Sequence, residues 1–220
     1  MEKITTSELV TDTVLLTDNV LLTDTILLTD NMLYKGEILN ELPHGLGLLY
    51  KNNVKIYEGD FFCGMQHGNG KSYMGDTIDY EGEFLNGLPH GFGKFYYQDS
   101  NYYYEGEIQN GLPHGFGKSY YQNGKLEYEG EFLNNKLHGI GKKFTDGRLI
   151  YEGEFQNDKP HGKGKFYTLD NVLNYEGDFS NNKFHGKGKK FNVNGNVEYE
   201  GDFSNNIFNN KNKILLNKQD

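Results

Sequence analysis

The chain has 220 residues, of which 35% are hydrophobic, 15% are aromatic and 29 are glycine. So few apolar side chains cannot build a thick globular core, but aromatic rings packed over bare glycine backbone can build a thin one. The formal net charge is −9, with 6 basic against 17 acidic side chains in residues 1–110 and 16 against 14 in residues 111–220, so the acidic first half argues against a nucleic-acid partner.

Cysteine content and hydropathy bear on the compartment. Cys63 is the only cysteine, so we expect no disulfide framework and a reducing environment. No stretch approaches the roughly 18 apolar residues of a membrane span, and Met1–Lys3 does not begin a secretory signal. We therefore expect a soluble cytoplasmic protein.

Residues 1–33 are an N-terminal arm with its own repeat. A six-residue pattern begins at Thr11, Thr17, Thr23 and Thr29. A period of six fits neither a helix nor a coiled-coil heptad. The β-branched content favours strand pieces of about three or four residues that cap the open edge of the next strands. The alternative is a flexible low-complexity arm that is mobile or loosely packed.

A second, longer repeat starts at residue 34. Each unit opens with a tyrosine, and the openings are 23 or 24 residues apart: Tyr34, Tyr57, Tyr80, Tyr104, Tyr128, Tyr151, Tyr175 and Tyr199. A fixed period of this length indicates a solenoid or array. We number the places of every unit from its opening tyrosine.

Each unit reads as a β-hairpin. Places one to five alternate aromatic and acidic residues around a glycine, as in Tyr80–Phe84, which is the period-two pattern of a strand with one apolar face. Asn-Gly or Asn-Asn then marks a turn. A second run leads from a histidine through Gly-x-Gly and a lysine to an aromatic residue at place seventeen. The sequence thus predicts an all-β fold, an elongated single-layer antiparallel solenoid of β-hairpins.

The expected strand register follows from the residue types. In the unit that opens at Tyr104 we place three pairs opposite each other: Gly106 with Gly117, Ile108 with Gly115, and Glu105 with Lys118. The same register pairs second-place glutamates with fifteenth-place lysines elsewhere: Glu58 with Lys71, Glu81 with Lys94, Glu129 with Lys142, Glu152 with Lys165, Glu176 with Lys189, and Glu200 with Lys213. Tyr120 shares the parity of Lys118, which a bulge around Gly-x-Gly would reconcile.

The array spans residues 34–217 as about eight hairpins, of which the last is degenerate. That last unit begins with the full first-strand pattern at Tyr199–Phe203 but has Asn209, Asn210 and Asn212 in place of the histidine and the two glycines. Terminal repeats are often atypical because their outer edge meets water. We expect Ile214–Leu216 to form its second strand.

Units of Tyr-Glu-Gly-Glu-Phe, a turn, and His-Gly-x-Gly-Lys resemble MORN repeats (membrane occupation and recognition nexus), and the resemblance covers residues 34–217. It implies an elongated β-hairpin array that frequently dimerises and lies at junctions between membranes and the cytoskeleton. Some members carry a catalytic domain, for which this sequence has no counterpart. Phosphoinositide binding is attributed to several members.

The histidines do not predict a metal site. All seven occupy place eleven: His44, His67, His90, His114, His138, His161 and His185. Equivalent places lie two strands, or roughly 9 to 10 Å, apart. One zinc ion needs its nitrogen ligands at about 2.0 to 2.1 Å, so two of these histidines cannot share an ion. We assign them a structural role at the turn, through a backbone hydrogen bond, and we expect no metal and no cofactor.

No catalytic residues are predicted either. Gly117, Lys118 and Ser119 imitate the end of a phosphate-binding loop, but the spacing is wrong and a strand replaces the required helix. Glu81 and Glu83 suit a ladder of salt bridges on the solvent face better than acid and base catalysis. We therefore expect a protein that is not an enzyme.

The favoured function is a scaffold or adaptor whose array mediates protein–protein association, including a homodimer, at a membrane–cytoskeleton junction. The predicted partner-binding residues are Tyr80, Phe84, Tyr104, Tyr128, Phe132, Tyr151 and Phe155. One alternative is a peripheral membrane adaptor that binds acidic phospholipid headgroups through a lysine stripe: Lys142, Lys143, Lys163, Lys165, Lys187, Lys189 and Lys190. Another is a regulatory subunit of a separate enzyme.

Overall fold

The computed structural model describes residues 22–29, 31–98 and 102–209, which form seventeen β-strands and no helix. The chain divides into two compact units, one of residues 1–102 with 108–111 and one of residues 103–107 with 112–220. The first contains β1 (Leu22–Thr29), β2 (Met32–Leu39), β3 (Leu42–Lys51), β4 (Val54–Phe62), β5 (Met65–Met74), β6 (Thr77–Leu85) and β7 (Leu88–Tyr96). The division falls within β8 (Tyr102–Gln109).

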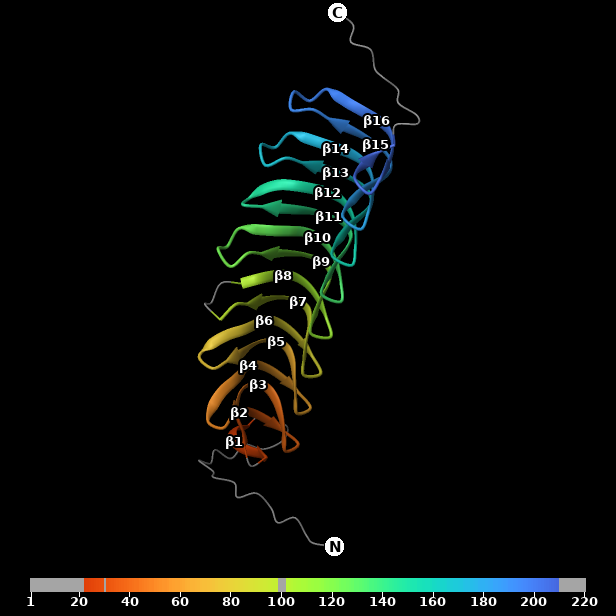
Figure 1. Ribbon diagram of the computed structural model, residues 1–220. Coiled ribbons are helices and arrows are strands. Elements are labelled where there is room, and N and C mark those ends of the chain that lie inside the picture. Colours follow the sequence, from red (N-terminus) through yellow and green to blue (C-terminus); the bar gives the residue numbers. More distant parts are fainter. Residues whose placement is uncertain (1–21, 30, 99–101, 210–220) are drawn as a thin grey trace, which may run out of the picture. The chain divides into compact units, whose positions relative to one another are not determined.

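The second compact unit holds the remaining strands. These are β9 (Leu112–Tyr120), β10 (Leu126–Leu133), β11 (Lys136–Thr145), β12 (Arg148–Gln156), β13 (Lys159–Tyr167), β14 (Leu173–Ser180), β15 (Lys183–Phe191), β16 (Val197–Ser204) and β17 (Ile207–Phe208). From β9 to β17, and from β1 to β7, every strand pairs antiparallel with its neighbours in sequence. Figure 1 shows these hairpins following one another within each compact unit. The all-β prediction of a single-layer antiparallel hairpin array is confirmed.

The hairpin turns follow the predicted chemistry. Both residues of the tight turn have positive φ, as at Asn134 (50°) and Asn135 (64°) or Asn86 (51°) and Gly87 (84°). This is the conformation of a type I′ turn, whose twist matches that of the flanking strands. Asparagine and glycine tolerate it better than other residues, which explains why places seven and eight are so restricted.

The core is a row of tyrosines over a row of glycines. The opening tyrosines from Tyr34 to Tyr175 are at most 2% exposed. In the pairing around Gly130, glycine faces glycine on both sides, because Gly117 and Gly141 are its partners. The Tyr128 ring lies over Gly141, where a Cβ atom would overlap it. The prediction that tyrosine rings rest on glycine backbone is therefore confirmed.

Each tyrosine is fixed at both ends. The Tyr128 hydroxyl donates to the carbonyl of Glu131 at 3.0 Å and to that of His138 at 3.3 Å. Its ring meets Phe132 of the same hairpin and Phe155 of the next edge-on, both with centroids 5.1 Å apart. Such aromatic pairs add about 0.5–1.5 kcal/mol each to the burial of apolar area. The rings thus tie neighbouring hairpins together.

The predicted register holds in one half of the hairpin and fails in the other. Glu129 lies opposite Lys142 and Gly130 opposite Gly141, as expected. Beyond them Phe132 lies opposite Leu137, whereas the pairing proposed for Ile108 and Gly115 would have put it opposite Gly139. Three residues, His138–Ile140, face the single Glu131, so a bulge does lie at Gly-x-Gly. Gly139 has a φ of 54°, the left-handed conformation that this bulge requires.

The two ends of the array differ from expectation. Instead of short strand pieces, β1 is one strand of eight residues that pairs along β2. Along Leu22–Thr29, β1 thus covers the edge of β2. The pattern before residue 22 lies outside the described residues, so the choice between a cap and a flexible arm stays a prediction. At the other end β16 pairs with the two-residue β17. Asn210, Asn212, Lys213 and Ile214–Leu216 also lie outside the described residues, so the predicted pair of Glu200 with Lys213 and the predicted second strand stay predictions.

Candidate interaction surfaces

The seven aromatic residues predicted to bind a partner are buried by their own chain. The exposed fractions are 0% for Tyr80, 4% for Phe84, 1% for Tyr104, 0% for Tyr128, 7% for Phe132, 2% for Tyr151 and 3% for Phe155. Their rings cover glycine backbone and each other, so they leave almost no area for a second molecule. We correct the assignment: these residues form the core, and any partner surface lies elsewhere.

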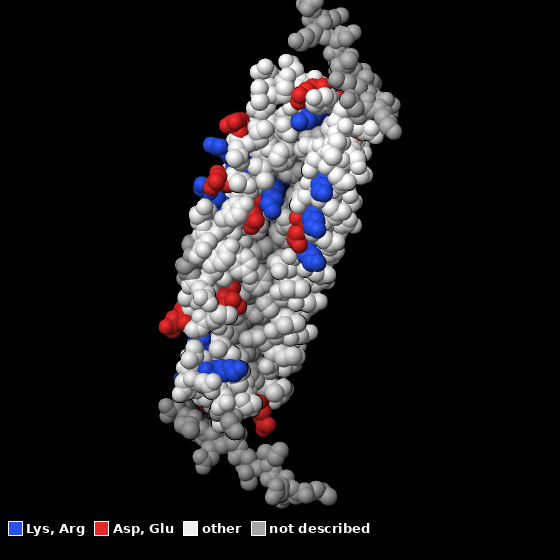
Figure 2. Space-filling view, viewed as in Figure 1, with Lys and Arg blue, Asp and Glu red and all other residues white. Residues whose placement is uncertain are grey.

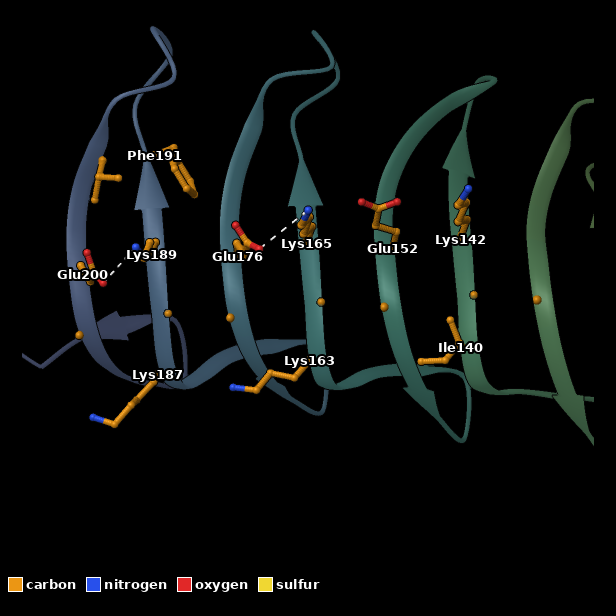
Figure 3. A pocket seen from close by; sticks show the side chains of 18 of the residues that line it. Ile140, Lys142, Glu152, Lys163, Lys165, Glu176, Lys187, Lys189, Phe191 and Glu200 are labelled. Atoms are coloured by element: carbon orange, nitrogen blue, oxygen red, sulfur yellow. Dashed lines mark ion pairs between the residues drawn. The ribbon is translucent and has the colours of Figure 1, made fainter.

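The opposite face of the sheet carries the predicted ladder of charges. The ion pairs run between successive hairpins, because Lys118 lies 3.6 Å from Glu129, Lys71 3.2 Å from Glu81, and Lys189 3.1 Å from Glu200. Within a hairpin the same lysines also lie opposite a glutamate in register, as Lys189 does with Glu176. Each ladder lysine is therefore flanked by two carboxylates (Figure 3).

The seventeenth-place tyrosines belong to this charged face. Tyr96 donates to Glu81 at 3.0 Å and Tyr167 to Glu152 at 2.7 Å. Burial, helped by the hydrogen bond to Glu152, raises the pKa of Tyr167 to about 12. Burial alone would raise the pKa of Glu81, but hydrogen bonds from Tyr96 and Lys71 outweigh it and lower the pKa. In these equivalent hairpins the place-seventeen tyrosine therefore lies on the same face of the sheet as the place-fifteen lysine, as the spacing of Tyr120 and Lys118 indicates. No bulge is needed to place the two on different faces.

The fourth-place carboxylate has a role that the sequence analysis missed. Glu83 was expected on a salt ladder, but its Oε1 accepts the backbone N–H of Phe92 at 3.0 Å. Glu131 accepts from Ile140 at 2.9 Å, and Asp178 from Lys187 at 2.9 Å. The carboxylate thus satisfies a backbone donor that the bulge removes from the strand ladder.

Replacing Glu131 with alanine is expected to lower the free energy of unfolding by about 2 kcal/mol, because the Ile140 N–H loses a charged acceptor. The matched control is Glu129→Ala, two residues away, whose carboxylate lies 3.6 Å from Lys118 and is about half exposed. An exposed pair of this kind contributes less than about 1 kcal/mol. Urea unfolding of both variants tests the difference, and equal losses would contradict the role assigned to Glu131.

A groove lies on the charged face of the second compact unit. Its volume is about 1310 Å³, and its lining includes the backbone of Gly141 and Gly164. Figure 3 shows Ile140, Lys163 and Lys187 on one side of it, and the ladder lysines on the other. A similar groove of about 630 Å³, which includes Leu46, lies in the first compact unit.

Exposed apolar side chains lie in the second unit's groove at place thirteen. Phe116 is 62% exposed and Ile140 is 57% exposed, and both line the groove. In the first unit Leu46 and Phe92, at the same place, are 62% and 63% exposed. In the repeat pattern this place is only an unspecified residue between two glycines. Its apolar identity in four of the seven complete units, against Asn69, Lys163 and Lys187 in the other three, was the signal that could have found it.

The seven lysines predicted to bind lipid do not form one stripe. Lys142, Lys163, Lys165, Lys187 and Lys189 line the groove, whereas Lys143 is paired in register with Tyr128 and Lys190 reaches the ring of Tyr199 at 6.0 Å. Four of the groove lysines also contact carboxylates: Lys163 with Asp178, Lys165 with Glu176, Lys187 with Asp202, and Lys189 with Glu200. Figure 2 shows acidic side chains interspersed among the basic ones on the face in view.

The histidines contribute mainly through their backbone. The carbonyls of His44, His138 and His185 accept hydrogen bonds from opening tyrosines at 3.2, 3.3 and 3.2 Å. The Nδ1 atoms of His67, His114 and His138 are buried without a hydrogen-bond partner. Among the described residues, no group of three or more histidine, cysteine, aspartate or glutamate side chains is arranged to hold a metal ion.

Comparisons with known proteins agree with this geometry. The MORN repeat matches residues 57–76, 80–102, 104–125, 128–147, 151–168, 175–197 and 199–211. No curated protein matches the chain. In the described part of the chain no helix is long and apolar enough to cross a membrane. The hairpin that opens at Tyr34 precedes the matched residues, yet its Tyr34 hydroxyl donates to Glu37 and its ring covers Gly47 as in the others. The chain therefore belongs to the MORN repeat family.

Proposed function

We propose that this chain is a non-enzymatic scaffold that holds a protein partner in the groove of its second compact unit. The observation that carries the proposal is the pair Phe116 and Ile140, whose side chains are more than half exposed in a groove of about 1310 Å³. Apolar side chains gathered in a groove are typical of interaction sites rather than of an ordinary solvent face.

The distribution of aromatic residues supports this choice of surface. The tyrosines and phenylalanines of the opposite face are buried in the core. The groove face combines an apolar edge with polar ladder residues, which is the usual make-up of a contact surface between proteins. The ladder pairs hold their own side chains in place, so the groove is formed before a partner arrives and binding costs less conformational entropy.

The cellular location is proposed from the MORN repeat family. MORN repeat proteins are typically non-enzymatic, and we propose that this chain works in the cytoplasm at a junction between a membrane and the cytoskeleton. A phosphoinositide adaptor has less support, because the predicted lysines divide between two faces and four of them already contact carboxylates. The headgroup would have to compete with those carboxylates.

The test is a double variant, Phe116→Ser with Ile140→Ser, compared with wild type in quantitative affinity capture. We expect the variant to lose the protein that wild type captures, or self-association in sedimentation, by about tenfold or more. Val193→Ser is the matched control, because Val193 is apolar and 84% exposed but does not line the groove. Equal capture by wild type and the double variant would overturn the proposal.

A further inference from the structure

Three lysines that the predicted stripe did not include form a row along the tight turns of the second compact unit. Lys136, Lys159 and Lys183 are the first residues of β11, β13 and β15, and all occupy place nine. All three are exposed. We call these three residues the turn lysine row.

The turn lysine row differs from the ladder in its neighbours. The residues opposite the row in register are uncharged: Leu133 faces Lys136, Gln156 faces Lys159, and Ser180 faces Lys183. The adjacent carboxylate of Asp158 accepts the backbone N–H of Leu137 at 2.9 Å. Among the described residues no carboxylate lies within ion-pair distance of the row, in contrast to Lys165 and Lys189. In the described residues the row therefore makes no ion pair of its own, and the one carboxylate beside it, that of Asp158, is engaged with a backbone N–H.

The spacing of the row favours one backbone conformation in an anionic partner. Successive lysines are separated by two strand spacings, about 9.4–9.8 Å. A polyproline II segment advances about 9.3 Å in three residues and returns each third side chain to the same face. An extended strand laid along the row would return side chains every 6.6–6.8 Å or so, and an α-helix every 5.4 Å or so. Of these repeats, the polyproline II spacing is the closest to that of the row.

The residue before the row adds an apolar end. Leu112 occupies place nine of the preceding hairpin, is the first residue of β9, and is 43% exposed. Leu133, opposite Lys136, is 39% exposed. One end of the row is therefore suited to an apolar side chain, and the rest to carboxylates.

We propose that the turn lysine row binds an acidic polyproline II segment of the protein partner, with a carboxylate at every third residue and an apolar residue at the end that reaches Leu112. The inference rests on the proposed function only in taking the partner to be a protein, since the row and the groove residues Phe116 and Ile140 are different side chains. A protein segment is favoured over an anionic bilayer because three lysines attract a membrane only weakly.

The test uses a labelled peptide in which three glutamates are each separated by two prolines, with a leucine at both ends. Fluorescence anisotropy at low salt should show it binding the full chain about tenfold more tightly than a peptide of equal composition whose glutamates are consecutive. Changing Lys136, Lys159 and Lys183 together to glutamine should remove this preference. The matched control changes the ladder lysines Lys142, Lys165 and Lys189 to glutamine and should keep it.

Two results would overturn the inference. One is equal binding of the two peptides, which would show that the row attracts acidic peptides nonspecifically. The other is row-dependent binding to anionic vesicles without peptide binding, which would assign the row to a membrane. The Phe116→Ser with Ile140→Ser variant should still bind the peptide, so failure of the row and failure of the groove proposal give different results.

Discussion

Replacing Gly130 with alanine is expected to destabilise the second compact unit by about 3 kcal/mol or more. A Cβ atom at this position would lie 2.5 Å from the Gly141 Cα atom and 2.5 Å from the Ile140 carbonyl oxygen. Both neighbours are backbone, so the strands β10 and β11 would have to separate where Tyr128 holds them together. The free energy of unfolding in urea, followed by circular dichroism, measures the loss.

Gly124→Ala is the matched control for this prediction. Gly124 also has positive φ, 76°, but a Cβ atom there would meet nothing within 4 Å. Its substitution therefore carries only the cost of the left-handed backbone, about 1–2 kcal/mol. The difference between the two variants combines the contact between strands with the difference in backbone conformation, a φ of 156° at Gly130 against 76° at Gly124. If Gly130→Ala lowered the free energy of unfolding no more than Gly124→Ala, the glycines would be required for their backbone conformation and not for the close approach of the strands.

The repeat made most of the fold predictable from the sequence. Where one unit departs from the pattern, the other units still show which residue type the position requires. The hairpins, the turns and the pairing of Glu129 with Lys142 could therefore all be derived. The close approach of tyrosine rings to glycine backbone could be derived as well, because a thin sheet with few apolar residues has no other way to bury Tyr128.

The burial of the aromatic face was less predictable, for identifiable reasons. Alternation shows that Tyr128 and Phe132 share a face, but it does not show that Phe155 of the next hairpin closes over them. The apolar face was therefore taken for an exposed surface. Parity alone predicts a ladder position for Glu83, and only the bulge brings its equivalent Glu131 to the Ile140 N–H. Three-dimensional closure and local bulges are what period-two reasoning cannot supply.

Alkaline pH is expected to unfold the array steeply, because its core tyrosines cannot ionise while buried. Burial raises the pKa of Tyr34 to about 12 and, with a neighbouring carboxylate, raises those of Tyr57, Tyr80, Tyr128, Tyr151 and Tyr175 further. Below pH 10, the ordinary tyrosine value, the stabilisation is fully present. Above it the unfolded chain loses protons that the folded chain keeps, so stability falls; the contribution of Tyr34 is lost as the pH passes about 12, and those of the other core tyrosines are lost at higher pH.

The expected slope is large because the groups act together. Each buried tyrosine removes about 1.4 kcal/mol of unfolding free energy per pH unit above its ordinary pKa. Tyr128→Phe is the matched variant. It should be less stable at neutral pH by about 1–2 kcal/mol, since the Glu131 and His138 carbonyls lose a donor, yet its stability should fall less steeply with pH. Lysine titration is common to both proteins and cancels in the comparison.

Urea unfolding from neutral pH to pH 11, with tyrosinate absorbance recorded alongside circular dichroism, tests this prediction. Because Tyr128 donates to a carbonyl and lies under the rings of two hairpins, its ionisation requires the hairpin to open. The chain also has tyrosines outside the opening place, so the tyrosinate signal of Tyr128 is taken as the difference between wild type and Tyr128→Phe. This difference and the loss of β-structure should change together. A difference signal that formed near pH 10 while the strands stayed paired would show that the Tyr128 ring reaches water in the folded state, and that the tyrosine row is not the core.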